Sequence, residues 1–492
     1  MSPRLIRAVC VAKAKICSGA ILSLILLGGV GCEQRSVRTT LDVIKARGEL
    51  RVLTRSDATS YTAEPHNPAG FEYELAQAFA NHLGVKLRPV FAHSVRDMVP
   101  ALLRGEADII AAGLAITKTL SSHLAFGPPY MEVTMEVVGR RGGYAPRAVA
   151  DLVGQPLWVH AGTVEEELLK EQKARYPQLS WRPVSEYETE DLLGMVCKGT
   201  IPLTVANSNI VAMQQRYYPH LVTHFPISER EPLAWAMNPR ASQLRAAVEN
   251  WFNRPETMAL IEQLRQHHYA HLSRFDFTDV VTYHRRLRER LPEYRKYFEA
   301  AGGRYGIDWR LVAALAYQES HWHPEAESFT GVKGLMMLTR KTAADLGVMR
   351  RLDPDESVFA GARYFAHLHR RIGVGVSEPD RTYMALAAYN VGWSHLEDAR
   401  LLARRLGKNP NAWPAVRSTL PLLGKREFYQ TLPHGFARGA EPVRFVDCIR
   451  TYHSILVQAT NALLVQREKG ADGGDNADDT SMGKKWGMSV VL

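Results

Sequence analysis

The sequence predicts a multidomain protein in which an α/β region of two lobes is followed by a mainly α-helical region. The length of 492 residues is about three times that of a typical domain of ~150 residues. From Leu50 onward, short apolar strands alternate with amphipathic helices. After residue 279 this alternation gives way to helical periodicity, so the two kinds of region follow one another along the chain.

The composition is that of a globular protein without metal or cofactor chemistry. With 46% hydrophobic and 23% charged residues, the chain can bury enough apolar surface to offset the entropy of ordering. The net charge of +10 favours approach to any polyanion but does not choose among them. The five cysteines are too scattered for a disulfide framework, and the histidines at 267, 268 and 271 lack a further ligand. We expect no metal, no cofactor and no nucleic-acid partner.

Residues 1–31 have the layout of a bacterial secretory signal peptide. Four basic residues within the first 15 precede an apolar run over 16–31 that ends at Cys32. The small residues before Cys32 resemble a lipoprotein processing site, although Gly29 stands where such sites usually carry leucine. Cleavage without acylation and retention as an anchor are the alternatives. Because Glu33 follows Cys32, the expected location is the periplasmic face of the outer membrane.

The region 32–271 contains the predicted α/β lobes. Its elements alternate along the chain, with strands over 50–54, 85–91, 108–113 and 157–163 and helices over 72–83 and 95–107. The helix over 72–83 places Leu75, Phe79 and Leu83 on one face, the spacing of a helix that packs on a sheet. Strand–helix–strand units indicate parallel strands, and the strand at 157–163 opens a second lobe.

Three phrases in this region resemble the bacterial extracellular solute-binding proteins of the amino-acid-binding family. They are GFEYELAQAFANHLGVKL, LLRGEADIIAAGLAITKT and FGPPY, and the resemblance covers roughly residues 40–270. It implies a two-lobed periplasmic-binding-protein-like clamshell with a ligand cleft at the hinge. The expected occupant is a muropeptide or another small ligand that tunes the second region. The alternative is a domain that has lost its ligand and only spaces or docks its neighbour.

Two positions depart from the amino-acid-binding pattern. Leu120 stands where the family carries the arginine that holds the ligand carboxylate, and the neutral Asn207 stands where an aspartate meets the ammonium group. An amino acid bound without either partner would have both of its charges desolvated and unpaired, at a cost of several kcal/mol. We therefore expect free α-amino acids to bind weakly or not at all.

The helical region is predicted over 272–469, with a disordered tail over 470–492. The basic stretch 280–306 has an ordinary buried side formed by leucines and aromatic residues, so its charges indicate a solvated face.

Residues 307–323 form a helix that places Glu319 on the same face as Trp309, Val312 and Ala316. Burial on that face would raise the pKa of the carboxyl and make it a general acid. A frayed helix end that points to solvent is the alternative.

Separated motifs downstream identify the helical region as similar to the soluble-lytic-transglycosylase-type catalytic domain, which is lysozyme-like in fold. The matching motifs, in chain order, are Glu319-Ser320, Gly334-Leu335-Met336, the helix at 361–371 and Ala388-Tyr389-Asn390. The combination with the front half resembles the membrane-bound murein-degrading enzymes of this kind. Two departures affect substrate contacts, because Met337 replaces a glutamine and Phe445 replaces a tyrosine.

The resemblance implies a lytic transglycosylase that acts on peptidoglycan glycan strands. Glu319 would protonate the glycosidic oxygen between N-acetylmuramic acid and N-acetylglucosamine, and the ionised carboxylate would then accept the proton of the sugar's own hydroxyl, which closes an anhydro ring. Ser320, Met336, Tyr389 and Asn390 would contact or orient the substrate. Glu325 and Glu327 read as solvated loop acids.

Two other functions are open at this point. A lysozyme-like hydrolase would act on the same polymer but needs a second carboxylate. A solute receptor with a non-catalytic wall-binding module would need no acid at all, and the intact Glu319-Ser320 pair disfavours it. The reaction products distinguish the hydrolase from the lyase, since hydrolysis adds a water molecule and transglycosylation does not.

Overall fold

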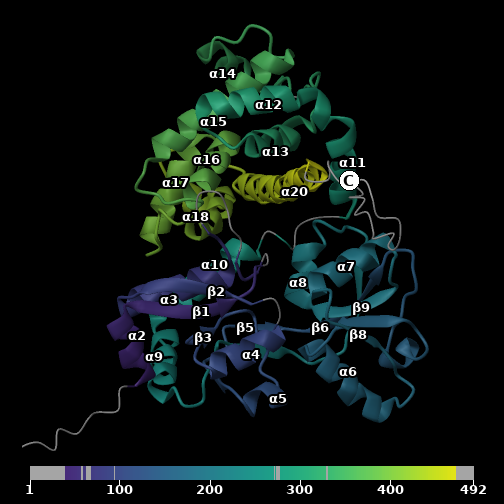
Figure 1. The fold of residues 1–492 in the computed structure, drawn as a ribbon. Helices are drawn as coiled ribbons and strands as arrows, with labels where there is room; N and C mark the ends of the chain where they lie inside the picture. Colours follow the sequence, from purple (N-terminus) through teal and green to yellow (C-terminus); the bar gives the residue numbers. More distant parts are fainter. Residues whose placement is uncertain are drawn as a thin grey trace, which may run out of the picture.

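The computed structural model describes residues 39–56, 59–61, 68–92, 95–270, 272, 277–328 and 331–471. The predicted signal peptide, Cys32, His271 and residues 472–492 of the predicted tail lie outside this part of the chain. Figure 1 shows two α/β lobes side by side, with the helical region above them and α20 below α13, on the side that faces the lobes. The expected fold class, a two-lobed α/β clamshell followed by a mainly helical region, is confirmed.

The first lobe is built on a five-stranded sheet with the order β2-β1-β3-β12-β4. β1 (Glu49–Thr54) pairs in parallel with β2 (Lys86–Phe91) and β3 (Ile109–Ile110), as the sequence predicts. β12 (Ala236–Met237) returns from far along the chain and lies antiparallel to β3 and to β4 (Ala125–Phe126). Its helices are α2 (Thr40–Arg47), α3 (Phe71–Leu83), α4 (Val95–Leu103), α5 (Lys118–Ser121), α9 (Ser242–Phe252) and α10 (Pro255–His268).

The second lobe has its own five-stranded sheet with the order β10-β6-β9-β7-β8. Its strands are β6 (Met135–Arg140), β7 (Leu157–His160), β8 (Arg182–Val184), β9 (Leu203–Asn207) and β10 (Leu221–Pro226). Its helices are the short 3-10 helix η1 (Val149–Leu152), α6 (Val164–Arg175), α7 (Thr189–Lys198) and α8 (Ser208–Gln214). The antiparallel pair of β5 (Met131–Val133) and β11 (Glu231–Leu233) carries the chain from one lobe to the other and back.

The helical region is formed by α11 to α20 around one large apolar core. Its elements are α11 (Phe277–Glu289), α12 (Leu291–Tyr305), α13 (Trp309–Ser320), α14 (Arg340–Asp345), α15 (Pro354–Ile372), α16 (Asp380–Val391), α17 (Trp393–Arg405), α18 (Trp413–Thr419), η3 (Leu420–Gly424), α19 (Arg426–Tyr429) and α20 (Ala440–Ala471). The basic stretch 280–306 forms α11 and α12 and buries Leu287, Leu291, Tyr294 and Phe298, which confirms its expected apolar side.

The α/β and helical regions meet at the end of α10. Arg450 of α20 donates to the backbone carbonyl of His267, and its guanidinium lies 4.3 Å from the ring centre of Tyr383. A second contact joins the hydroxyls of Tyr217 and Ser454, 3.0 Å apart. The hydrogen bonds to His267 and Tyr217 attach both lobes to the helical region that carries the site described next.

Candidate active site

The end of α13 places Glu319 in the last helical turn. Asp308 caps the start of the helix by accepting from the backbone N–H of Arg310 at 2.9 Å. The helix ends because His321 and Trp322 both adopt left-handed backbone conformations, with φ of 54° and 57°. Such conformations cost about 1–2 kcal/mol for residues other than glycine, so packing must hold them. The Trp322 ring is buried and its Nε1–H donates to the carbonyl of Ala313 at 2.9 Å.

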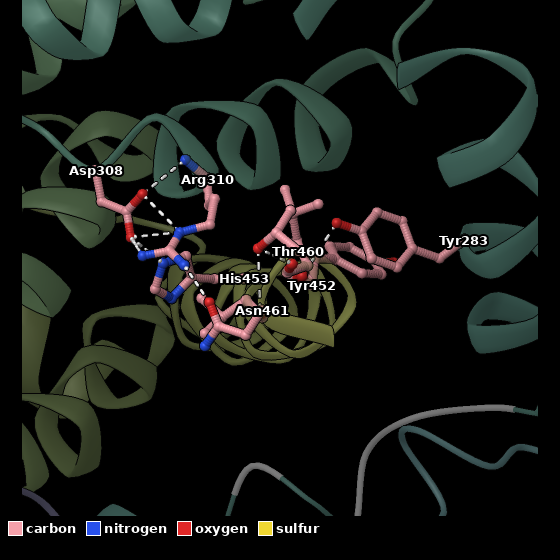
Figure 2. Close-up of polar contacts among 9 residues, drawn as sticks. Tyr283, Asp308, Arg310, Tyr452, His453, Thr460 and Asn461 are labelled. Atoms are coloured by element: carbon pink, nitrogen blue, oxygen red, sulfur yellow. Dashed lines mark hydrogen bonds and ion pairs between the residues drawn. The ribbon is translucent and has the colours of Figure 1, made fainter. Parts of the chain in front are cut away.

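Polar contacts fix the other end of α13 against α20, as Figure 2 shows. The Asp308 carboxylate lies 3.1 Å from Nε2 of His453 and accepts from Nε of Arg310 at 2.9 Å. Burial alone would raise the pKa of Asp308, but the hydrogen bonds from His453 and Arg310 outweigh it and hold this pKa well below its ordinary value. Arg310 also reaches the side chain of Asn461 at 3.4 Å. The helix that carries Glu319 is therefore anchored at its far end by charged groups.

A tight turn over 331–338 lies against the end of α13. Gly334 has φ of +87°, and a Cβ at this position would lie 1.8 Å from the carbonyl oxygen of Arg351, so no other residue fits. The Ser320 hydroxyl is buried and shares a hydrogen bond between the carbonyls of Leu335 (2.9 Å) and Ala316 (3.1 Å). Ser320 thus joins the helix end to the turn.

Glu319 lies at this junction with an unusual electrostatic environment. The residue is partly exposed, but burial of its carboxyl raises the pKa to about 8, with no second cause. Among the described residues, neither a hydrogen bond nor an ion pair engages this carboxyl. The neutral form therefore predominates at pH 7. Such a group can donate a proton near neutral pH, which an ordinary surface glutamate cannot.

Tyr389 of α16 closes the site from the opposite side. Its hydroxyl donates to the backbone carbonyl of Met336 in the turn at 3.0 Å. Its ring lies nearly parallel to that of Phe445, with an interplanar angle of 11° and 6.5 Å between centroids. Burial, followed by the nearby Glu319 carboxylate, raises the pKa of Tyr389 well above its ordinary value. The hydroxyl is therefore a neutral donor at all ordinary pH values.

The other sequence-predicted residues differ in what they present. The Met336 side chain is fully buried against Gly361, so only its backbone faces the Tyr389 hydroxyl. Asn390 is exposed next to Tyr389 on α16. Glu325 and Glu327 are exposed in the loop after α13, and Glu327 pairs with Lys333 at 2.9 Å.

Sequence reasoning missed the backbone strain that gathers around Glu319. In the described part of the chain, three residues other than glycine have positive φ, and they are His321, Trp322 and Met337. All three lie at the end of α13 or in the facing turn. Histidine is among the residue types enriched in this conformation, so His321 carries a weak signal, whereas Trp322 and Met337 carry none.

The predicted ligand cleft is present between the lobes of the α/β region. Leu120 and Asn207 both line a cavity there. The side chain of Asn207 caps α8 by accepting from the N–H of Asn209 at 2.8 Å, so it is already engaged. Arg55 of the first lobe contacts Glu190 of the second at 2.9 Å, close to the cavity.

Comparison with known proteins matches both regions. The family of bacterial extracellular solute-binding proteins, family 3, matches residues 50–271, and the Transglycosylase SLT domain matches residues 296–411. Membrane-bound lytic murein transglycosylase F 1 from Alkalilimnicola ehrlichii is 44% identical over 425 residues, 86% of either chain. Membrane-bound lytic murein transglycosylase F from Ectopseudomonas mendocina is 39% identical over 447 residues, 90% of this chain and 91% of that one.

Among solved structures, the cysteine-binding protein from Campylobacter jejuni aligns with a TM-score of 0.44 and 18% identity, over 49% of this chain and 98% of that chain. Within the residues that the structure describes, no helix is both long enough and apolar enough to span a membrane. No group of three or more histidine, cysteine, aspartate or glutamate side chains in the same residues could hold a metal ion.

Proposed function

This chain belongs to the family of membrane-bound lytic murein transglycosylase F, and from that premise we propose that it cleaves peptidoglycan glycan strands with Glu319 as the acid. The observation that supports this role most strongly is the raised pKa of Glu319, about 8, in the absence of any counter-charge. A carboxyl in this state holds its proton at neutral pH and can deliver it to a leaving oxygen.

The proposed reaction needs no water. Glu319 gives its proton to the oxygen between N-acetylmuramic acid and N-acetylglucosamine, and that bond breaks as the muramoyl acetamido oxygen stabilises the cationic carbon. The Glu319 carboxylate then takes the proton of the C6 hydroxyl as this oxygen attacks the same carbon. The products are a free N-acetylglucosamine end and an anhydromuramoyl end, and Glu319 is protonated again.

Three residues support the acid in this proposal. Ser320 is a positioning residue, because its hydroxyl joins the end of α13 to the carbonyl of Leu335. Tyr389 holds the same turn through the carbonyl of Met336. Asn390 is exposed beside Tyr389, and we assign its amide to the substrate acetamido group.

A lysozyme-like hydrolase is the second candidate, and it would need a second carboxylate near the bond that breaks. Glu325 and Glu327 follow Glu319 in the loop, but both are exposed, and Glu327 is paired with Lys333. We therefore favour the lyase.

The proposed organisation assigns residues 32–271 to a ligand-binding domain and 272–469 to the catalytic domain. The signal at 1–31 and acylation of Cys32 would attach the protein to the periplasmic face of the outer membrane. The relatives named membrane-bound support membrane association. Replacing Cys32 with serine should release the protein from the membrane fraction, and continued retention would contradict the anchor.

Mass spectrometry of digested sacculi tests the reaction. The lyase yields muropeptides lighter by one water molecule than the hydrolase products. Glu319→Gln should abolish the formation of anhydro products and of hydrolysed products alike. Glu325→Gln is the matched control and should leave the anhydro products unchanged. Reducing muramic ends, or a large loss in Glu325→Gln, would favour the hydrolase.

A further inference from the structure

The cleft between the two α/β lobes holds a cavity that opens to solvent. Residues from both lobes line it. Its walls include the aromatic rings of Phe71, Tyr130 and Tyr269 together with apolar side chains such as Met131 and Leu233. Such walls suit a ligand with an apolar body, and the charges of the cleft decide which polar group it carries.

The cationic group of the cleft is already neutralised. Arg55 lines the cavity, and its guanidinium contacts both carboxylate oxygens of Glu190 at 2.9 Å. Glu188 lies near the same guanidinium at 3.8 Å. A ligand carboxylate would have to displace these acids, so Arg55 offers little to an anion.

The carboxylate of Glu72, which also lines the cleft, is engaged by hydrogen bonds within the protein. Glu72 is buried and accepts hydrogen bonds from the N–H of Gly113 (2.9 Å), from Nε1–H of Trp235 (3.0 Å) and from the Tyr130 hydroxyl. Three donors satisfy its charge within the protein. Glu72 therefore holds the wall of the cleft together and leaves little for a ligand.

Glu165 differs from both of these groups. It lies in the first turn of α6, lines the cavity and is 7% exposed. Among the described residues, no hydrogen bond or ion pair engages its carboxyl. The next residue, Glu166, is satisfied by the N–H of Gly162 at 2.7 Å and by Lys170 at 3.1 Å, so the contrast lies between neighbours on one helix.

Glu167 extends the same acidic side. It also lines the cavity, and none of its carboxyl oxygens has a partner in the described part of the chain. The partial positive charge at the N-terminus of α6 lowers the free-energy cost of placing two carboxylates near one cleft. It does not supply a counter-ion. Buried charges are normally paired, so a partner from outside the chain would complete this site.

We propose that this cleft binds an organic cation, a primary ammonium or guanidinium group on an apolar chain, with Glu165 as its counter-charge and Glu167 in support. The ligand needs no carboxylate, since Arg55 is engaged by Glu190 and Leu120 supplies no charge. The aromatic walls favour a cation further through their π faces. This site lies in the α/β region and is independent of the proposed reaction at Glu319.

Calorimetric titration of the full-length protein tests the proposal, with cadaverine and agmatine as cationic probes and glutarate and L-glutamine as the anionic and zwitterionic comparisons. We expect the cations to bind and Glu165→Gln to weaken them tenfold or more. Glu171→Gln is the matched control, because Glu171 lies on the same helix but is exposed outside the cavity lining. The proposal would be overturned if neither cation binds, if the cations bind Glu165→Gln as tightly as the parent protein, or if glutamine binds as tightly as the cations.

Thermal unfolding provides a second readout. Saturating cadaverine should raise the melting temperature of the parent protein and leave that of Glu165→Gln unchanged, because a ligand stabilises only the protein that binds it. An equal rise in both proteins, or no rise in the parent protein, would overturn the assignment. Activity on sacculi is measured separately, so failure here is distinguishable from failure of the proposed reaction.

Discussion

Two glutamates, the buried Glu72 in the α/β region and the partly exposed Glu319 in the helical region, have opposite surroundings. Glu72 in the α/β region accepts from a backbone N–H, an indole N–H and a phenol hydroxyl. Glu319 in the helical region has no such donor among the described residues, and burial raises its pKa to about 8.

The difference teaches that, between these two carboxylates, the presence of donors separates the structural group from the reactive one. Donors favour the charged form and turn Glu72 into a structural hub. At Glu319, burial of the carboxyl without such donors favours the neutral form and leaves a proton to give. The strained backbone at His321, Trp322 and Met337 surrounds the second group, as expected where the fold holds a reactive residue at some cost.

The largest expected effect comes from removing the proton of Glu319. Glu319→Gln keeps the shape of the side chain but cannot donate a proton to the leaving oxygen, so turnover of sacculi should fall by ~10²–10⁴-fold or more. The rate of release of soluble muropeptides measures this effect. A variant that solubilises sacculi at the parental rate would remove Glu319 from the mechanism.

Replacing Glu72 should lower the stability of the protein and leave its turnover nearly unchanged, whereas replacing Glu319 should lower its turnover. Glu72→Gln presents an amide N–H₂ to donors that need an acceptor, so the free energy of unfolding of the α/β region should fall by about 2–3 kcal/mol. Calorimetric unfolding measures the loss, while initial turnover at low temperature should change little. A stabilised Glu72→Gln variant would break the comparison between the two glutamates.

The stability of Glu319→Gln should depend on pH. The folded protein keeps the Glu319 proton up to about pH 8, whereas the ordinary value for a free glutamate is 4.5. The folded state thus binds more protons in this window, and the parent protein loses stability as pH rises through it. Relative to the parent, Glu319→Gln should gain about 1–3 kcal/mol between pH 5 and 9, after allowance for partial exposure. Melting curves of both proteins at these pH values measure the gain, and a pH-independent difference would contradict the raised pKa.

The smallest expected effect concerns the support of the turn. Tyr389→Phe loses the hydrogen bond to the carbonyl of Met336, which should cost about 1 kcal/mol of unfolding free energy. Turnover should fall as well, but far less than in Glu319→Gln. Tyr364→Phe is the control, because the Tyr364 hydroxyl has no hydrogen bond among the described residues. Equal losses in both variants would argue against a specific role for the Tyr389 hydroxyl.

Periodicity accounted for most of what sequence reasoning could establish. The apolar stripe of 307–323 predicts the helix and places Glu319 at the end of that stripe, and the alternation of strands and helices predicts the parallel part of the first sheet. Both are local patterns of spacing. The motif at 334–336 begins with a glycine whose close approach to Arg351 admits no other residue.

Long-range pairing and backbone strain could not be predicted. β12 joins the first sheet after the chain has built the whole second lobe, and no local pattern encodes that return. The pairing of Arg55 with Glu190 joins residues 135 positions apart. The left-handed conformation of Trp322 arises from packing, since its residue type does not favour it, and the histidine at 321 gives only a weak signal.

A direct titration of the Glu319 carboxyl tests the central claim. Carbon-13 NMR of protein labelled at glutamate side-chain carboxyls, with Glu319→Gln to assign the missing signal, reports its protonation state as pH changes. The account predicts a carboxyl that is still mostly protonated at pH 7 and titrates near pH 8. A midpoint close to the ordinary value of 4.5 would contradict it, because the carboxyl would then be ionised at neutral pH and have no proton to donate.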